Sequence, residues 1–109
     1  MPAKSKRPVT KRTIHKLDVS KISPLRVGNN VIIRTVTIYE IGKIESITKD
    51  EIVLSSASWV AYTGRLHNIL KSGFDSNSEI EPYDGPASVS RGAIVSVLNW
   101  NHLLPVDQK

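Results

Sequence analysis

The sequence predicts a mainly β domain: a small, strongly bent antiparallel sheet or barrel of about five strands, with one short helix inserted before the last two strands. Residues 31–62 are dense in β-branched and aromatic residues and contain only short turn signals. A single later segment has the apolar spacing of a helix, and two short apolar runs follow it. A chain of 109 residues has room for one such domain.

The first predicted strands form an antiparallel meander. Residues 31–39 are the first strand, because their two alternating sets of side chains would line opposite faces. Residues 41–48 follow, and the change of apolar spacing predicts a bulge or bend near Gly42. Lys49-Asp50 is a tight turn, after which residues 51–56 form a third strand and residues 57–62 a further extended stretch.

One short helix follows this meander. Leu66, Ile69 and Leu70 have the i, i+3, i+4 spacing of an apolar stripe. Thr63 is the predicted N-cap, since its hydroxyl can accept a backbone N–H of the first turn. Gly73 is placed to end the helix in a left-handed cap.

The C-terminal part combines a loop with the last two strands. Residues 74–86 are acidic and rich in turn formers, so they predict an exposed loop anchored by Ile80 and Tyr83. Residues 87–90 and 93–98 are the last strands, with Arg91-Gly92 at a hinge between them, where Gly92 supplies positive φ or a close approach. Trp100 is the residue that could cover one end of the barrel, or simply pack there.

Positive charge is concentrated at the N-terminus. Residues 1–26 hold eight Lys or Arg and one acid, a net charge of +7, whereas residues 27–109 hold seven Lys or Arg and nine acids, a net charge of −2. The predicted organisation is therefore a disordered basic arm over 1–26, a β-domain over 27–104 and a short tail over 105–109. Such an arm is expected to bind polyanions or simply to keep the chain soluble. A membrane partner is not expected, because large apolar residues do not accompany the charges.

Several classes of chemistry are not expected. The chain has no Cys, which excludes internal disulfides and thiolate metal sites. Its three His are far apart in sequence and lack metal-ligand spacing, and the common catalytic and phosphate-loop motifs are missing. We therefore expect a non-enzymatic protein without a cofactor, a metal or a small-molecule substrate. Neither a transmembrane helix nor a secretory signal is expected, so the expected location is the cytoplasm.

Two groups of residues resemble the Sm-like superfamily, which includes the LSm and Hfq proteins. The stretch from Val31 to Leu54, with Gly42 at its bend, is similar to the family's first motif. Arg91-Gly92 between apolar residues is similar to its second motif. The residues after Asp50 and Gly92 depart from the family pattern at the base-binding pocket. Residues 34–65 also resemble small uncharacterised proteins encoded in phage and bacterial genomes. This resemblance implies that the expected cytoplasm is that of a bacterium or of a phage-infected cell.

The Sm-like resemblance implies a cyclic homo-oligomer of about five to seven subunits that binds RNA or another single-stranded nucleic acid. Such rings pair the exposed edges of neighbouring sheets, which stabilises a small domain. At the ring lumen, Arg91 would contact RNA together with Gly92, whereas the structural alternative pairs Arg91 with Glu79 or Glu81. Several basic arms on one ring would add avidity.

Further contacts are predicted from the residue types themselves. Arg65 at the helix start could bind a phosphate or only cap a surface. Trp59 and Tyr62 could stack on bases or, for Trp59, pack the helix onto the sheet; Tyr39 is a further possible stacking residue. The arm residues would contact phosphates without reading sequence. These residues are Lys4, Lys6, Arg7, Lys11 and Arg12.

Two functions are consistent with these features. The first is an RNA-binding ring with basic arms. The second is a structural protein, such as a phage assembly component, whose domain is a scaffold and whose arm grips a partner.

Overall fold

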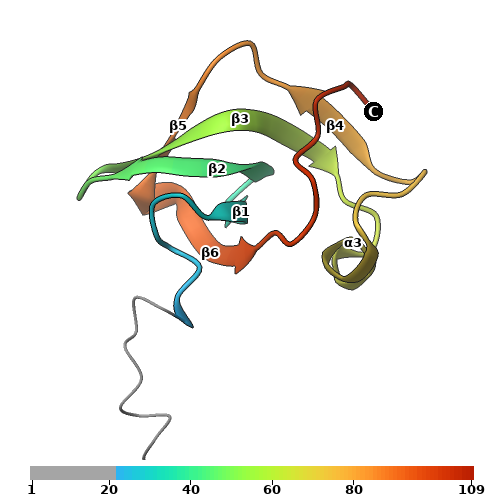
Figure 1. Ribbon diagram of the computed structural model, residues 1–109, viewed down its shortest axis with the longest axis horizontal. Coiled ribbons are helices and arrows are strands. Elements are labelled where there is room, and N and C mark those ends of the chain that lie inside the picture. Colours follow the sequence, from blue (N-terminus) through green and yellow to red (C-terminus); the bar gives the residue numbers. More distant parts are fainter. Residues whose placement is uncertain (1–21) are drawn as a thin grey trace, which may run out of the picture.

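The computed structural model describes residues 22–109. The predicted arm residues Lys4, Lys6, Arg7, Lys11 and Arg12 lie outside the described residues. Within the described part, the chain is mainly β and forms one strongly bent, antiparallel sheet that does not close into a barrel (Figure 1). The predicted fold class is confirmed, with six strands in place of about five.

The strands are β1 (Asn30–Thr35), β2 (Tyr39–Ile47), β3 (Glu51–Tyr62), β4 (Glu79–Pro82), β5 (Ala87–Ser90) and β6 (Ile94–Asn99). The sheet has the strand order β4-β3-β2-β1-β6, and β5 pairs with the other half of β3. All pairs are antiparallel. The long β3 therefore carries two short strands along one edge, and the chain bends around it (Figure 1).

The prediction of the first strand, residues 31–39, was wrong at its C-terminal end, because β1 ends at Thr35. Residues 36–38 form a turn, so β1 and β2 make a hairpin at the point where the sequence pattern predicts continuous extension. Thr35 stabilises this turn: its N–H and its hydroxyl both donate to the Ile38 carbonyl oxygen, each at 2.8 Å. The Thr35 hydroxyl also accepts the Ile38 N–H at 3.0 Å. Local side-chain hydrogen bonds of this kind compete with strand continuation.

Gly42 lies at a bulge, as predicted. The β2–β3 register shifts between Ile41 and Lys43. A Cβ at Gly42 would lie 3.0 Å from the Leu54 Cβ and 3.0 Å from the Ser55 carbonyl oxygen. Glycine is therefore required here by the close approach of β3.

The predicted third and fourth strands are one continuous strand. β3 runs through residues 51–62 and contains Ser56 at a φ of 48°. This left-handed residue shifts the alternation in the middle of β3, which explains why the sequence pattern reads as two separate strands.

The short helix α3 (Leu66–Ser72) is capped differently from the prediction. Arg65, with extended backbone angles, is the N-cap residue, and its side chain makes no capping hydrogen bond. The Thr63 hydroxyl donates instead to the Gly64 carbonyl oxygen at 2.7 Å. Gly73 ends the helix at the predicted position, with a φ of 87° and a ψ of 178°, and its N–H donates to the Ile69 carbonyl oxygen. Thr63 was the wrong residue because the chain turns at Gly64, which has a φ of 70°, and the helix starts only after Arg65.

The predicted loop over residues 74–86 contains β4, so the helix precedes three strands and not two. Ile80 is buried and pairs with Val60, which confirms it as an anchor. Between β5 and β6, the 3₁₀ turn η1 (Arg91–Ala93) occupies the predicted hinge.

Two apolar clusters form the core, and β1 contributes to both from its opposite faces: Val31 and Ile33 to the first, and Ile32 to the second. In the first, Ile44, Ile52 and Leu54 are fully buried, and Leu25 packs against them at the entrance of the domain. The second contains Trp100, which is only 3% exposed and belongs to the core. The remaining buried members of the two clusters are Ala57 and Val89, and Ile41, Val60, Ile69 and Ile80.

The last residues lie against the sheet (Figure 1). Lys109 and Ile80 exchange two backbone hydrogen bonds, of 2.9 and 2.8 Å. Residues 105–109, expected as a tail, thus end beside β4 and cover part of its edge. Among residues 22–109, no helix is long and apolar enough to cross a membrane.

Candidate nucleic-acid and partner interface

Arg91 is exposed and connects η1 to the turn between β2 and β3. Its guanidinium donates to the Thr48 carbonyl oxygen at 2.8 Å, and its backbone N–H donates to the Asp50 carbonyl oxygen at 3.0 Å. Its hydrogen bond therefore goes to a backbone carbonyl, and not to Glu79 or Glu81 as in the structural alternative. Because a guanidinium has five N–H donors, one such bond leaves donors that can reach a phosphate.

Gly92 does not have the backbone role that we expected. Its φ is not in the positive range that glycines 28, 64, 73 and 85 adopt. A Cβ at Gly92 would meet only the Ser90 hydroxyl oxygen, at 3.8 Å. An alanine would fit at this position, so neither a left-handed conformation nor a close approach requires glycine here.

Trp59 lies on the solvent-facing side of β3 and does not pack the helix onto the sheet. Its side chain is 38% exposed. In the strand register Trp59 is directly opposite Glu40 of β2 on one side and Glu81 of β4 on the other. Directly paired residues project from the same face of an antiparallel sheet. The indole is therefore set between two carboxylates.

Tyr83 adds a second ring to this surface. Its hydroxyl donates to Glu40 Oε1 at 2.6 Å, and its N–H donates to the Ala57 carbonyl oxygen at 2.9 Å. Burial raises the pKa of Glu40, and the hydrogen bond from Tyr83 opposes part of that rise. Burial together with the neighbouring Glu40 raises the pKa of Tyr83. We call Glu40, Trp59, Glu81 and Tyr83 the Trp59 face.

The other predicted contacts are spread over the domain. Tyr39 is half-buried and packs against the second core cluster, so little of its ring faces solvent. Tyr62 is 56% exposed near the end of β3. Arg65 is exposed at the start of α3. The fold thus does not gather Arg65, Arg91 and Trp59 into one predicted site.

Sequence reasoning missed that two acidic residues flank Trp59. Glu40 is 19 residues before Trp59, and Glu81 is 22 residues after it. Only the pairing of β2, β3 and β4 brings them together, and β4 lies within the segment predicted as a loop. The alternation around Trp59 was the one signal that could have placed its ring outside the core.

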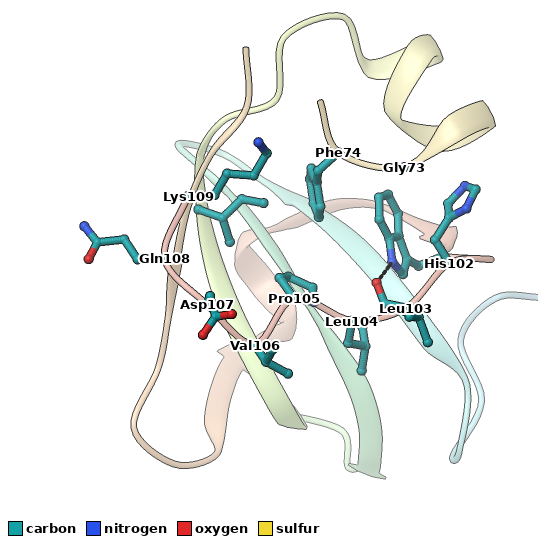
Figure 2. A pocket seen from close by; sticks show the side chains of 12 residues that line it. Gly73, Phe74, His102, Leu103, Leu104, Pro105, Val106, Asp107, Gln108 and Lys109 are labelled. Carbon is teal, nitrogen blue, oxygen red and sulfur yellow. Dashed lines mark hydrogen bonds between the residues drawn. The ribbon is translucent and has the colours of Figure 1, made fainter. Parts of the chain in front are cut away.

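A hollow of about 500 Å³ lies beneath the C-terminal segment (Figure 2). Its aromatic wall is Trp100 with Phe74, whose ring centroids are 4.6 Å apart. The Trp100 Nε1–H donates to the Leu103 carbonyl oxygen at 3.1 Å, and His102 Nε2 lies 3.0 Å from the Leu70 carbonyl oxygen. These polar groups hold the segment in place. In residues 22–109 there is no group of three or more His, Cys, Asp or Glu that could hold a metal ion.

Two strands have an edge without a partner within the described part of the chain. β5 pairs only with β3, and β6 pairs only with β1. Near the β6 edge, Val95 and Val36 are 57% and 74% exposed. Unpaired edges beside exposed apolar side chains are surfaces on which strands of another chain can add.

Comparison of the chain with protein-family models, curated proteins and solved structures finds no match. The similarity to the Sm-like superfamily therefore remains a prediction from the sequence.

Proposed function

We propose that the protein is a non-enzymatic, homo-oligomeric nucleic-acid-binding protein with Sm-like architecture. The observation that carries this proposal is the division of charge along the chain, +7 over residues 1–26 and −2 over residues 27–109. Phosphate contacts by Lys and Arg supply most of the affinity for single strands, without sequence preference. The basic segment is the element that binds RNA, and the domain assembles the segments.

Assembly into a ring is supported by the unpaired edges of β5 and β6. Pairing the β5 edge of one subunit with the β6 edge of the next is a heterologous contact, and such contacts close into rings when the rotation allows it. It would also cover Val95 and Val36. A ring of about five to seven subunits then presents as many basic segments, which raises avidity.

The test is native mass spectrometry and RNA titration of the full-length protein. The variant K4Q/K6Q/R7Q/K11Q/R12Q removes five positive charges outside the domain. We expect a ring for both proteins, and a slope of log affinity against log salt that is shallower in the variant by about 0.7 for each phosphate that its basic segment no longer neutralises. A monomer, or unchanged RNA affinity of the variant, would contradict the proposal.

The variant Arg91→Ala then distinguishes RNA contacts at the proposed ring lumen from RNA contacts made by the basic segment. Loss of RNA affinity in this variant, at unchanged oligomeric state, would assign RNA contact to Arg91. Unchanged affinity would leave all contact to residues 1–26.

The scaffold function is the second candidate, and one observation favours it. The exposed ring of Trp59 lies between Glu40 and Glu81, where carboxylates repel a phosphate backbone. A domain that repels nucleic acid at its exposed Trp is better suited to holding a cationic protein segment. A stable ring that binds no RNA would support this function.

A further inference from the structure

Among residues 22–109, the Trp59 face is an exposed sheet surface with defined chemistry. Trp59 and Tyr83 are each 38% exposed, and the carboxylates of Glu40 and Glu81 lie on the same side of the sheet. Tyr83 fixes the orientation of Glu40 through its hydroxyl. The surface therefore offers an aromatic face and two negative charges side by side.

This combination recognises a cationic chain. A guanidinium or ammonium group binds over an indole and pairs with a neighbouring carboxylate, and Arg can do both at once. A phosphate group meets only like charge here. The occupant that fits is thus a chain segment rich in Lys and Arg.

The chain itself carries such a segment. Residues 1–21 include Lys4, Lys6, Arg7, Lys11 and Arg12 and are joined directly to the domain. Fully extended, 21 residues span roughly 70 Å. A compact domain as long as residues 22–109 has a radius of gyration of only about 12 Å. The segment can therefore reach the Trp59 face. A short tether also gives it a local concentration in the millimolar range, far above that of a separate molecule.

We propose that the basic N-terminal segment docks on the Trp59 face of its own chain, and that nucleic acid must displace this contact before the segment binds phosphates. The competition rests on the proposed nucleic-acid function, whereas the docking does not. Exposed ion pairs are individually weak and are screened by salt. The docked state is therefore salt-sensitive, and a polyanion of high charge density displaces it.

The absence of cysteine from the chain makes a direct test possible. Ser5→Cys in the full-length protein carries a nitroxide spin label, and the two indole N–H signals are observed by NMR. Trp59 reports docking, while the buried Trp100, whose Nε1–H is bonded to Leu103, is the internal reference. At low salt we expect strong broadening of the Trp59 signal relative to that of Trp100. At about 1 M salt, where the Debye length is about 3 Å, the signal recovers.

A matched pair of charge variants isolates the Trp59 face. E40Q/E81Q removes its two charges and keeps an acceptor for the Tyr83 hydroxyl. E45Q/E51Q makes the same change of net charge away from the Trp59 face. Glu45 of β2 accepts from the Ser55 hydroxyl, and Glu51 of β3 accepts from the Ser88 hydroxyl. We expect E40Q/E81Q to lower the ratio of docked to undocked chains by roughly threefold to tenfold, and E45Q/E51Q to leave it nearly unchanged. Equal effects of the two variants would overturn the proposal.

Two further measurements distinguish a failure of the docking proposal from a failure of the proposed nucleic-acid function. Mixing spin-labelled chains with isotope-labelled, spin-free chains detects contacts between molecules, and broadening confined to that mixture would overturn docking within one chain. Addition of a poly(U) oligonucleotide of about 20 nucleotides should restore the Trp59 signal in step with its binding. RNA binding without any low-salt broadening overturns the docking and leaves the proposed function intact. Broadening without RNA binding supports the docking and contradicts the nucleic-acid function.

Discussion

The Tyr83 hydroxyl donates to Glu40 Oε1 at 2.6 Å and thereby connects the segment after β4 to β2, across the intervening β3. The two residues are 43 positions apart in the sequence. This hydrogen bond opposes the burial of Glu40 without cancelling it, so the pKa of Glu40 remains raised.

The raised pKa of Glu40 makes stability depend on pH. In the folded state Glu40 holds its proton more tightly than in the unfolded chain, so its contribution is complete below the ordinary Glu pKa of 4.5 and is lost as pH rises through the higher folded pKa. Glu40→Gln should flatten this part of the pH profile. Tyr83→Phe, which removes the donor, should raise the pKa of Glu40 further and widen the pH window.

These profiles are measured by urea unfolding between about pH 4 and pH 7. Glu45→Gln is the control, since it removes the same charge from an exposed position on the same strand. A Glu40→Gln profile that runs parallel to the unsubstituted one would show that Glu40 does not contribute as described.

Gly42→Ala should destabilise the domain by about 1–3 kcal/mol, because the new Cβ would press on β3 at Leu54, Ser55 and Ala57. Gly92→Ala is the matched control. A Cβ there meets no atom closer than the Ser90 hydroxyl oxygen at 3.8 Å, and we expect a change within about 0.5 kcal/mol. Thermal or urea unfolding of both variants provides the comparison, and equal losses of stability would contradict the close approach at Gly42.

Ser58→Ala should stabilise the domain by about 1 kcal/mol. The Ser58 side chain is fully buried, and its hydroxyl oxygen has no hydrogen-bond partner among the described residues. Removing an unsatisfied buried group relieves its desolvation cost. Unfolding in urea measures the gain.

Ser78→Ala is the contrasting variant for that experiment. Its buried hydroxyl donates to the Thr63 carbonyl oxygen at 3.2 Å and accepts the Asp75 N–H at 3.3 Å. The substitution should cost about 1 kcal/mol or more, because it leaves both of these backbone groups without their hydrogen bond to the hydroxyl. A destabilised Ser58→Ala variant would indicate that the Ser58 hydroxyl has a partner after all.

The elements that the sequence predicted correctly are those governed by local chemistry. Gly42 could be placed at a bulge because the apolar spacing changes there. Gly73 could be placed at the end of the helix because it follows the apolar stripe. The errors lie where a local hydrogen bond or a distant partner changes the outcome. The Thr35 hydroxyl donates to the Ile38 carbonyl oxygen, and β1 ends there, earlier than predicted. The acidic segment after the helix forms β4 because Ile80 pairs with Val60 of β3.

The sequence by itself determined the β-rich class, the single short helix and the division of charge between residues 1–26 and the remainder, since strand propensity, apolar spacing and composition are properties of neighbouring residues. Only the tertiary structure decided that β3 carries both β4 and β5, that Arg91 donates to Thr48, and that Trp59 lies between Glu40 and Glu81. These relationships depend on strand register between distant segments. Register is fixed by burying apolar side chains of several strands together in the two core clusters, and no local pattern encodes which remote residues become neighbours.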